Sequence, residues 1–214
     1  MYYLDCGVVL RYKDINENDR IVTAFTKNYG RVEILFKGVK KTKAKLRGIS
    51  EIFTYSIFRL YIKRYGIMPL CIGGSIIDSY PEIRNDLRKI FTMFSVSSVI
   101  ISITPLFQRS DEKFELLLSS LNYLKENEKI SEWFFVIFLA NLLTYSGVGF
   151  RDTNIGYETD FWRRIHSLNF QTMDELEKYN DLKYKVLDFF IQKINENFNS
   201  TYKLNDFIGV LEEV

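Results

Sequence analysis

The chain of 214 residues is poor in the side chains that hold metal ions and form disulfides, with two cysteines and one histidine. Cys6 and Cys71 lie far apart and form neither a CxxC pair nor the framework of a secreted domain, so we expect a reducing cytoplasmic compartment and no zinc site. Both are expected to be small buried residues. His166 has no cysteine or second histidine near it, which favours a surface or packing role over a catalytic one.

Motifs of catalysis and of membrane insertion are missing as well. The sequence contains no GxxxxGK[ST], HExxH or GxSxG. No basic stretch precedes an apolar one at the N-terminus, and the best candidate span, residues 134–143, has about half the length a bilayer requires. Asp14, Glu17 and Asp19 are close together, but beside Arg20 solvation or ion pairing explains them better than metal binding. We therefore expect no enzyme activity, no cofactor and no membrane span.

Positive charge, by contrast, is concentrated in one segment. Residues 37–47 read Lys-Gly-Val-Lys-Lys-Thr-Lys-Ala-Lys-Leu-Arg, with six cations and no acid. Residues 1–80 hold 14 Lys plus Arg against 7 Asp plus Glu, a net charge of +7, whereas residues 81–214 hold 15 against 20, a net charge of −5. Charge runs are usually solvated, but one so one-sided predicts a loop that binds a polyanion such as nucleic acid.

The spacing of apolar residues divides the chain into two kinds of structure. Alternation with a period of two predicts five strands, at residues 3–12, 20–26, 31–36, 52–62 and 68–80. Gly73 and Gly74 fit a bulge or a barrel corner. After Pro81 the period becomes 3.6, which predicts a helix ending near Pro105 and further helices at about 111–124, 131–147 and 187–198. The fold class is therefore α+β, with a five-stranded barrel at residues 1–80 and an all-helical domain at residues 81–214.

A five-stranded barrel with polar loops is the setting of an OB-fold, which binds oligonucleotides over its second and third strands and the loops beside them. Those loops are residues 12–19 and 62–67. Tyr29 and Tyr65 lie in predicted turns beside cations, where base stacking and ordinary turn packing are both open. The predicted phosphate-binding residues are the six cations of residues 37–47 and four that extend the field: Lys37, Lys40, Lys41, Lys43, Lys45, Arg47, Arg20, Arg31, Lys63 and Arg64.

Several segments carry a resemblance to a known family in their order and spacing. They are residues 7–11 (GVVLR), 17–26 (ENDRIVTAFT), 29–31 (YGR), 36–48 (FKGVKKTKAKLRG), 53–55 (FTY) and 60–61 (LY), with weaker matches at 83–89, 134–143 and Gly147. Together they resemble the bacterial recombination mediator RecO. The resemblance implies an OB-fold and a helical domain that bind single- and double-stranded DNA, anneal complementary strands, and help RecR and single-stranded-DNA-binding protein to load RecA.

One departure from that family concerns its zinc site. Many members carry four cysteines shortly after the position of Gly147, and residues 151–168 contain none. We expect packing of the apolar side chains there to replace the metal, or the segment to have become a mobile loop. The apolar residues concerned are Phe161, Trp162, Ile165 and Leu168.

Two other functions remain open from the residues themselves. The helical half is acidic and strongly apolar, as an adaptor between proteins would be, and the basic segment would then dock the acidic tail of a partner. A barrel of this kind also suits an RNA-binding protein. Salt-dependent binding to DNA, RNA and an acidic peptide would separate the three.

Overall fold

The computed structural model describes residues 1–63, 68–149 and 159–212. They form two compact units, which are Met1–Pro81 with Val96–Phe114, and Glu82–Ser95 with Glu115–Val214. Arg64 and Tyr65 lie outside the described residues, as does most of the loop predicted at residues 62–67. The functional boundary between residues 80 and 81 stays a prediction; by packing, the first unit also takes in residues 96–114.

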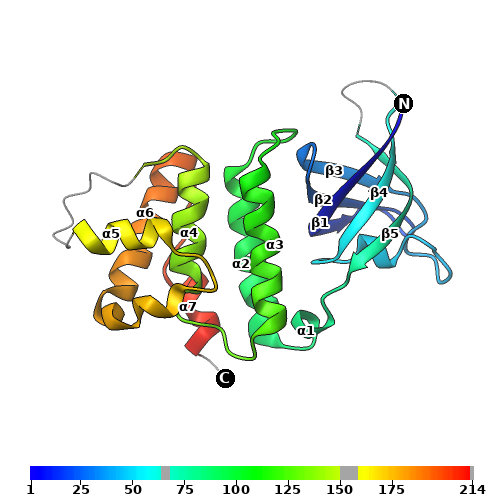
Figure 1. The fold of residues 1–214 in the computed structure, drawn as a ribbon. Helices are drawn as coiled ribbons and strands as arrows, with labels where there is room; N and C mark the ends of the chain where they lie inside the picture. Colours follow the sequence, from blue (N-terminus) through cyan, green and yellow to red (C-terminus); the bar gives the residue numbers. More distant parts are fainter. Residues whose placement is uncertain (64–67, 150–158, 213–214) are drawn as a thin grey trace. The chain divides into compact units, whose positions relative to one another are not determined.

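The first unit is built on five strands that form a closed barrel (Figure 1). The strands are β1 (Tyr2–Asp14), β2 (Arg20–Thr26), β3 (Gly30–Phe36), β4 (Tyr55–Tyr61) and β5 (Leu70–Asp78), in the order β1-β2-β3-β5-β4. Pairing is antiparallel except between β3 and β5, which meet in parallel at Leu35 and Leu70. The long β1 pairs with both β2 and β4, so the ring closes through this strand. The predicted five-stranded OB-fold barrel is confirmed.

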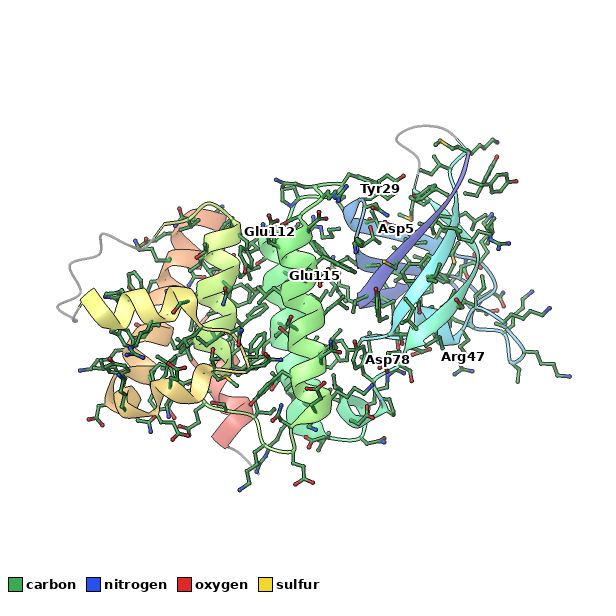
Figure 2. The ribbon with its side chains drawn as sticks, in the orientation of Figure 1. Asp5, Tyr29, Arg47, Asp78, Glu112 and Glu115 are labelled. Carbon is green, nitrogen blue, oxygen red and sulfur yellow. The ribbon has the colours of Figure 1, made fainter. Side chains whose placement is uncertain are left out.

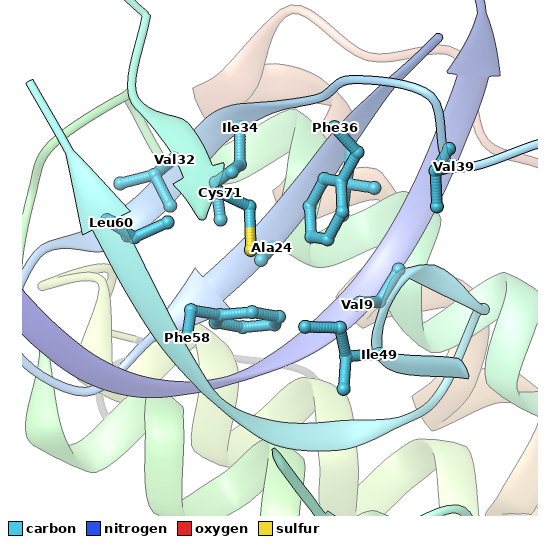
Figure 3. Close-up of a cluster of buried hydrophobic side chains, with 11 residues drawn as sticks. Val9, Ala24, Val32, Ile34, Phe36, Val39, Ile49, Phe58, Leu60 and Cys71 are labelled. Atoms are coloured by element: carbon cyan, nitrogen blue, oxygen red, sulfur yellow. The ribbon is translucent and has the colours of Figure 1, made fainter. Parts of the chain in front are cut away.

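Alternating burial along the strands explains why this sequence forms a barrel. In β3 the side chains of Val32, Ile34 and Phe36 are buried while the residues between them are partly exposed, and β4 buries Phe58 and Leu60 in the same way. The Phe36 and Phe58 rings meet edge to face, 6.3 Å between centroids. Figure 3 shows the resulting core, whose members are Val9, Val22, Ala24, Val32, Ile34, Phe36, Val39, Ile49, Phe58, Leu60 and Cys71.

The two cysteines are free thiols, of which Cys71 is buried and Cys6 is partly exposed. Burial in the apolar interior raises the pKa of Cys71 to about 11, because an apolar surrounding disfavours the thiolate. Cys71 is thus a small buried residue, as expected from the sequence, whereas the same expectation for Cys6 is wrong because its side chain is partly exposed.

The barrel unit also contains the end of α2 (Leu87–Ile103) and the beginning of α3 (Asp111–Glu126). The segment between these helices runs beside the start of β3, where Arg31 and Leu106 form a parallel bridge. The Phe107 N–H donates to the Arg31 carbonyl at 2.8 Å. Phe114 stacks on Phe25 with 6.3 Å between ring centroids. Through these contacts, residues that are distant from the strands in sequence become part of the barrel unit.

The second unit is helical. Its further elements are α4 (Phe134–Tyr145), α5 (Thr159–Ser167), the 3-10 helix η2 (Met173–Leu182), α6 (Lys183–Phe198) and α7 (Asn205–Glu212); the short α1 (Pro81–Arg84) begins at the end of the first unit. Helix α4 is buried from Phe134 to Ala140 because its residues are apolar on all sides there, and Gly147 follows its end in the left-handed conformation (φ +76°). The all-helical half is confirmed. None of the helices in residues 1–63, 68–149 and 159–212 is long and apolar enough to cross a membrane.

The cysteine-free segment is described from residue 159 onward. Phe161, Trp162, Ile165 and Leu168 are all buried. The Trp162 ring packs edge-on against Phe190 of α6, with 6.2 Å between centroids. Apolar packing thus fixes α5 in the second unit; residues 151–158 lie outside the described part.

Candidate nucleic-acid interface

The segment of residues 37–47, here called the basic loop, leaves the barrel at the end of β3. Its backbone forms consecutive hydrogen-bonded turns: the Lys41 N–H donates to the Gly38 carbonyl (3.3 Å), Ala44 to Lys41 (3.0 Å) and Arg47 to Ala44 (3.2 Å). A further turn from Arg47 leads into the short helix η1 (Gly48–Ser50). The loop is therefore a compact coil of turns.

Apolar residues interspersed among the cations attach the basic loop to the barrel. Val39 is 1% exposed and belongs to the barrel core, and Leu46 packs partly buried against the same core. Ile49 of η1 follows them into the interior. Because the apolar side chains are directed inward, the charged ones face solvent: Lys37, Lys40, Lys41, Lys43, Lys45 and Arg47 are all exposed. Figure 2 labels Arg47 at this part of the barrel.

A second connection, the β1–β2 turn (residues 15–19), holds the basic loop from the side. The Asp19 carboxylate accepts the Gly38 N–H at 2.7 Å, and the Asn18 carbonyl accepts the Lys40 N–H at 3.1 Å. The Lys40 ammonium lies 3.2 Å from both the Asn16 carbonyl and the Asp14 carboxylate. Lys40 is thus the one loop cation, among the residues described, that the structure records in an ion pair.

Arg20 and Arg31 were predicted to extend the cationic field, and the structure places both guanidinium groups in internal contacts. Arg20 is 8% exposed; it donates to Asp14 (3.0 Å), Glu51 (3.2 Å) and the Ser50 hydroxyl (3.2 Å). It also lies over the Tyr12 ring, 3.5 Å from the centroid.

Arg31 and Lys63 differ in their surroundings. Arg31 donates to the Ile101 carbonyl near the end of α2, and burial lowers its pKa. Lys63 is exposed beyond the end of β4. The structure therefore brings the six loop cations together and leaves Arg20 and Arg31 as part of the scaffold. DNA contact by any of these residues stays a prediction.

Tyr29, one of the two tyrosines considered for base stacking, packs within the β2–β3 turn. Its ring lies 4.9 Å from the Tyr3 ring, and its N–H donates to the Thr26 hydroxyl at 3.3 Å. The neighbouring Asn28 donates to the Asp5 carboxylate (Figure 2 labels Asp5 and Tyr29). Tyr29 is nevertheless 39% exposed, so base stacking at this position stays a prediction beside turn packing.

Sequence reasoning missed the residues of the β1–β2 turn that orient the basic loop. Asn16 and Asp19 were assigned only to a polar stretch or to solvated acids. The Asn16 side-chain oxygen accepts the N–H groups of Asn18 (2.8 Å) and Asp19 (2.7 Å). The run Asn-Glu-Asn-Asp is typical of such turns and could have indicated the local conformation, although not the partner across it.

We predict that the purified chain contains no stoichiometric zinc. Zinc sites need about four Cys or His ligands, and no group of three or more His, Cys, Asp or Glu lies close enough to hold a metal within the described ranges. Elemental analysis is expected to find no zinc, and a chelator is expected to leave the melting temperature unchanged. One zinc per chain would contradict the prediction.

Comparison with known proteins places the chain among its relatives. The family model described as recombination protein O, N terminal, matches residues 1–80. The DNA repair protein RecO of Halalkalibacterium halodurans is 32% identical over 126 residues, 59% of this chain and 49% of that protein. The RecO proteins of Clostridium acetobutylicum (30% over 165 residues, 77% of this chain and 64% of that protein) and Clostridium perfringens (32% over 151 residues, 69% and 59%) are similar too.

The chain thus spans about half the length of some of the curated relatives it matches, and more of others. The matched region includes the barrel and the basic loop. These findings confirm the resemblance drawn from the sequence: residues 1–80 match the family model of the recombination protein O N-terminal region.

Proposed function

We propose that this protein binds single- and double-stranded DNA through its basic loop and acts in DNA repair and recombination. The names of its relatives state DNA repair for them, and the description of the matching family model states recombination. The observation that carries the proposal is the exposure of all six loop cations on a loop fixed to the barrel by hydrogen bonds and apolar contacts. Loop cations held in one place present a concentrated positive field to a phosphate backbone.

The mechanism we propose is electrostatic. Lys37, Lys41, Lys43, Lys45 and Arg47 would each neutralise a phosphate, without reading bases, since lysines act as mobile point charges. Neutralised strands repel one another less, which lowers the barrier to annealing and requires neither covalent chemistry nor a cofactor. Arg20 and Arg31 would contribute by holding the barrel rather than by touching DNA.

Partners belong to the same proposal. We infer that the chain cooperates in the cytoplasm with RecR and with the acidic, apolar tail of single-stranded-DNA-binding protein, and so assists RecA loading. The helical unit has a hollow of about 910 Å³ between the end of α3 and η2. Glu126, Glu132 and Glu177 line it against a single lysine, Lys129. This charge disfavours an acidic tail, so we do not assign the tail to this hollow.

The test is a titration of the chain, by fluorescence anisotropy at several salt concentrations, with single-stranded DNA, duplex DNA, RNA and an acidic peptide. If five cations contact phosphates, the logarithmic salt slope should be about −3.5 on single strands and about −4.5 on duplex. Tight binding to the peptide with weak binding to DNA would favour the adaptor function instead, and preference for RNA would favour the RNA-binding one. Accelerated annealing of complementary strands would test the mechanism directly.

A further inference from the structure

Asp19 is a carboxylate that lies beside a proposed phosphate-binding site, where simple electrostatics would count it as unfavourable. Its Oδ1 accepts the Gly38 N–H at 2.7 Å, and Oδ2 accepts the Asn16 amide at 3.1 Å. Lys37 and Lys41 are close enough to act on its charge. A carboxylate here repels phosphate and also neutralises part of the field of two loop cations.

Asp19 bonds to Gly38, the second residue of the basic loop, and this contact gives it a second role. Gly38 has a positive φ (+63°) and starts the series of turns, since its carbonyl accepts the Lys41 N–H. The bond to Asp19 therefore fixes the residue from which the rest of the loop continues. The adjacent bond from the Lys40 N–H to the Asn18 carbonyl fixes the next turn.

The carboxylate is itself oriented before it meets the loop. Asn16 accepts the Asp19 N–H and donates to its Oδ2, so the side chain is held from both ends. The Gly38 N–H, and then the Asn16 amide, lower the pKa of Asp19 below its ordinary value. Asp19 is therefore ionised at neutral pH and accepts a charge-assisted hydrogen bond, which is stronger than a neutral one.

We propose that Asp19 is a positioning residue that increases the affinity of the basic loop for nucleic acid phosphates, despite its negative charge. Ordering a loop at the moment of binding costs conformational entropy, and a loop ordered beforehand avoids that cost. The gain from ordering five cations outweighs the repulsion of one partly exposed carboxylate that water still screens. This inference rests on the proposed function, because it concerns the same site.

Three substitutions separate the hydrogen bond from the charge. Asp19→Ala removes both, Asp19→Asn removes the charge and keeps an oxygen that can accept the Gly38 N–H, and Glu17→Ala removes an equal charge from an exposed side chain of the same turn. On single-stranded DNA we expect about tenfold weaker binding for Asp19→Ala, from lost preorganisation. Asp19→Asn and Glu17→Ala should bind as tightly as the unmodified chain or more tightly, since each removes a repulsive charge.

A readout that needs no DNA accompanies the titration. The basic loop contains six sites for trypsin, and limited proteolysis should cut it faster in Asp19→Ala than in the unmodified chain, with no change in Glu17→Ala. Asn16→Ala, which leaves the net charge unchanged and removes the groups that orient Asp19, should shift both readouts in the same direction. It also provides a test if Asp19→Ala fails to fold.

The outcomes distinguish the inference from the proposed function. Binding by Asp19→Ala as tight as that of Glu17→Ala, with unchanged proteolysis, would overturn the positioning role while leaving DNA binding intact. If the unmodified chain does not bind DNA, the proposed function is wrong, and so is the inference that Asp19 increases affinity for DNA. Faster cutting of Asp19→Ala in that case would show only that Asp19 orders the loop.

Discussion

Replacement of Lys37, Lys41, Lys43 and Lys45 by alanine is expected to reduce affinity for single-stranded DNA by roughly 600-fold at 0.1 M salt, if each lysine contacts one phosphate. Each lost contact reduces the steepness of the logarithmic salt slope by about 0.7, so four lost contacts reduce it by about 2.8. If the two proteins bind equally at 1 M salt, this difference amounts to roughly 600-fold at 0.1 M salt. All four side chains are exposed, and Lys40 is left in place because it bonds to the β1–β2 turn. Anisotropy titrations over a salt series would measure both quantities.

The matched control removes the same amount of charge from the helical unit. Lys129, Lys178, Lys185 and Lys203 are exposed there, and their replacement by alanine should change affinity and slope little. Circular dichroism should show both variants folded. Equal losses in the two variants would mean that net charge rather than the basic loop governs binding, and an unchanged slope in the loop variant would contradict the proposed site.

The second large effect is expected from Gly30→Ala, on stability rather than on binding. Gly30 begins β3 with a φ of +66°, and a Cβ added there would overlap the carbonyl of Gln108. Left-handed conformation costs an L-residue about 1–2 kcal/mol, and overpacking adds about 1–3 kcal/mol. The sum is a large part of the stability of a typical domain, about 5–15 kcal/mol. Thermal melting should show a drop in Tm of about 10 °C or more.

Gly38→Ala is the control for backbone conformation. Gly38 has nearly the same φ, and its added Cβ would meet nothing closer than the Lys41 side chain at 3.8 Å. It should lose only the cost of the left-handed conformation, about 1–2 kcal/mol. If the two variants melt at the same temperature, then the segment of residues 106–108 does not press on the start of β3, and the contact between Phe107 and Arg31 is unimportant to the unit.

Much of this architecture was predictable because local rules and the final packing agree. Because successive side chains of a strand point to opposite faces, the alternation of Val32, Ile34 and Phe36 indicates directly which side chains face the core. The long apolar faces of α2, α3, α4 and α6 gave those helices for a similar reason. The shorter α5, η2 and α7 span too few turns for a helical period to stand out in the sequence, and their positions depend on contacts such as Trp162 with Phe190.

The candidate site was predictable in charge but not in arrangement. A run of lysines can be counted, whereas the environment of an arginine depends on partners distant in sequence. Arg31 meets the Ile101 carbonyl 70 positions later, and Arg20 meets Glu51 31 positions later. The acids near Arg20 indicated its ion pair with Asp14, but no local pattern marks either arginine as buried. For the same reason, the sequence does not indicate the bond from Gly38 to Asp19, because these residues belong to different loops that come together only in the folded barrel.

The way in which the basic loop is held has a consequence for its evolution. Main-chain atoms of Gly38, Lys40 and Asn18, with the side chains of Asp19 and Lys40, make the bonds that link the two loops. The side chains of Lys41, Lys43 and Lys45 are not needed for those bonds. Mutation can therefore add or remove these lysines without changing the conformation of the basic loop. The affinity for nucleic acid can then change to suit the salt concentration of a habitat. Among descendants of this sequence, Gly38 and Asp19 should persist while the number of lysines drifts.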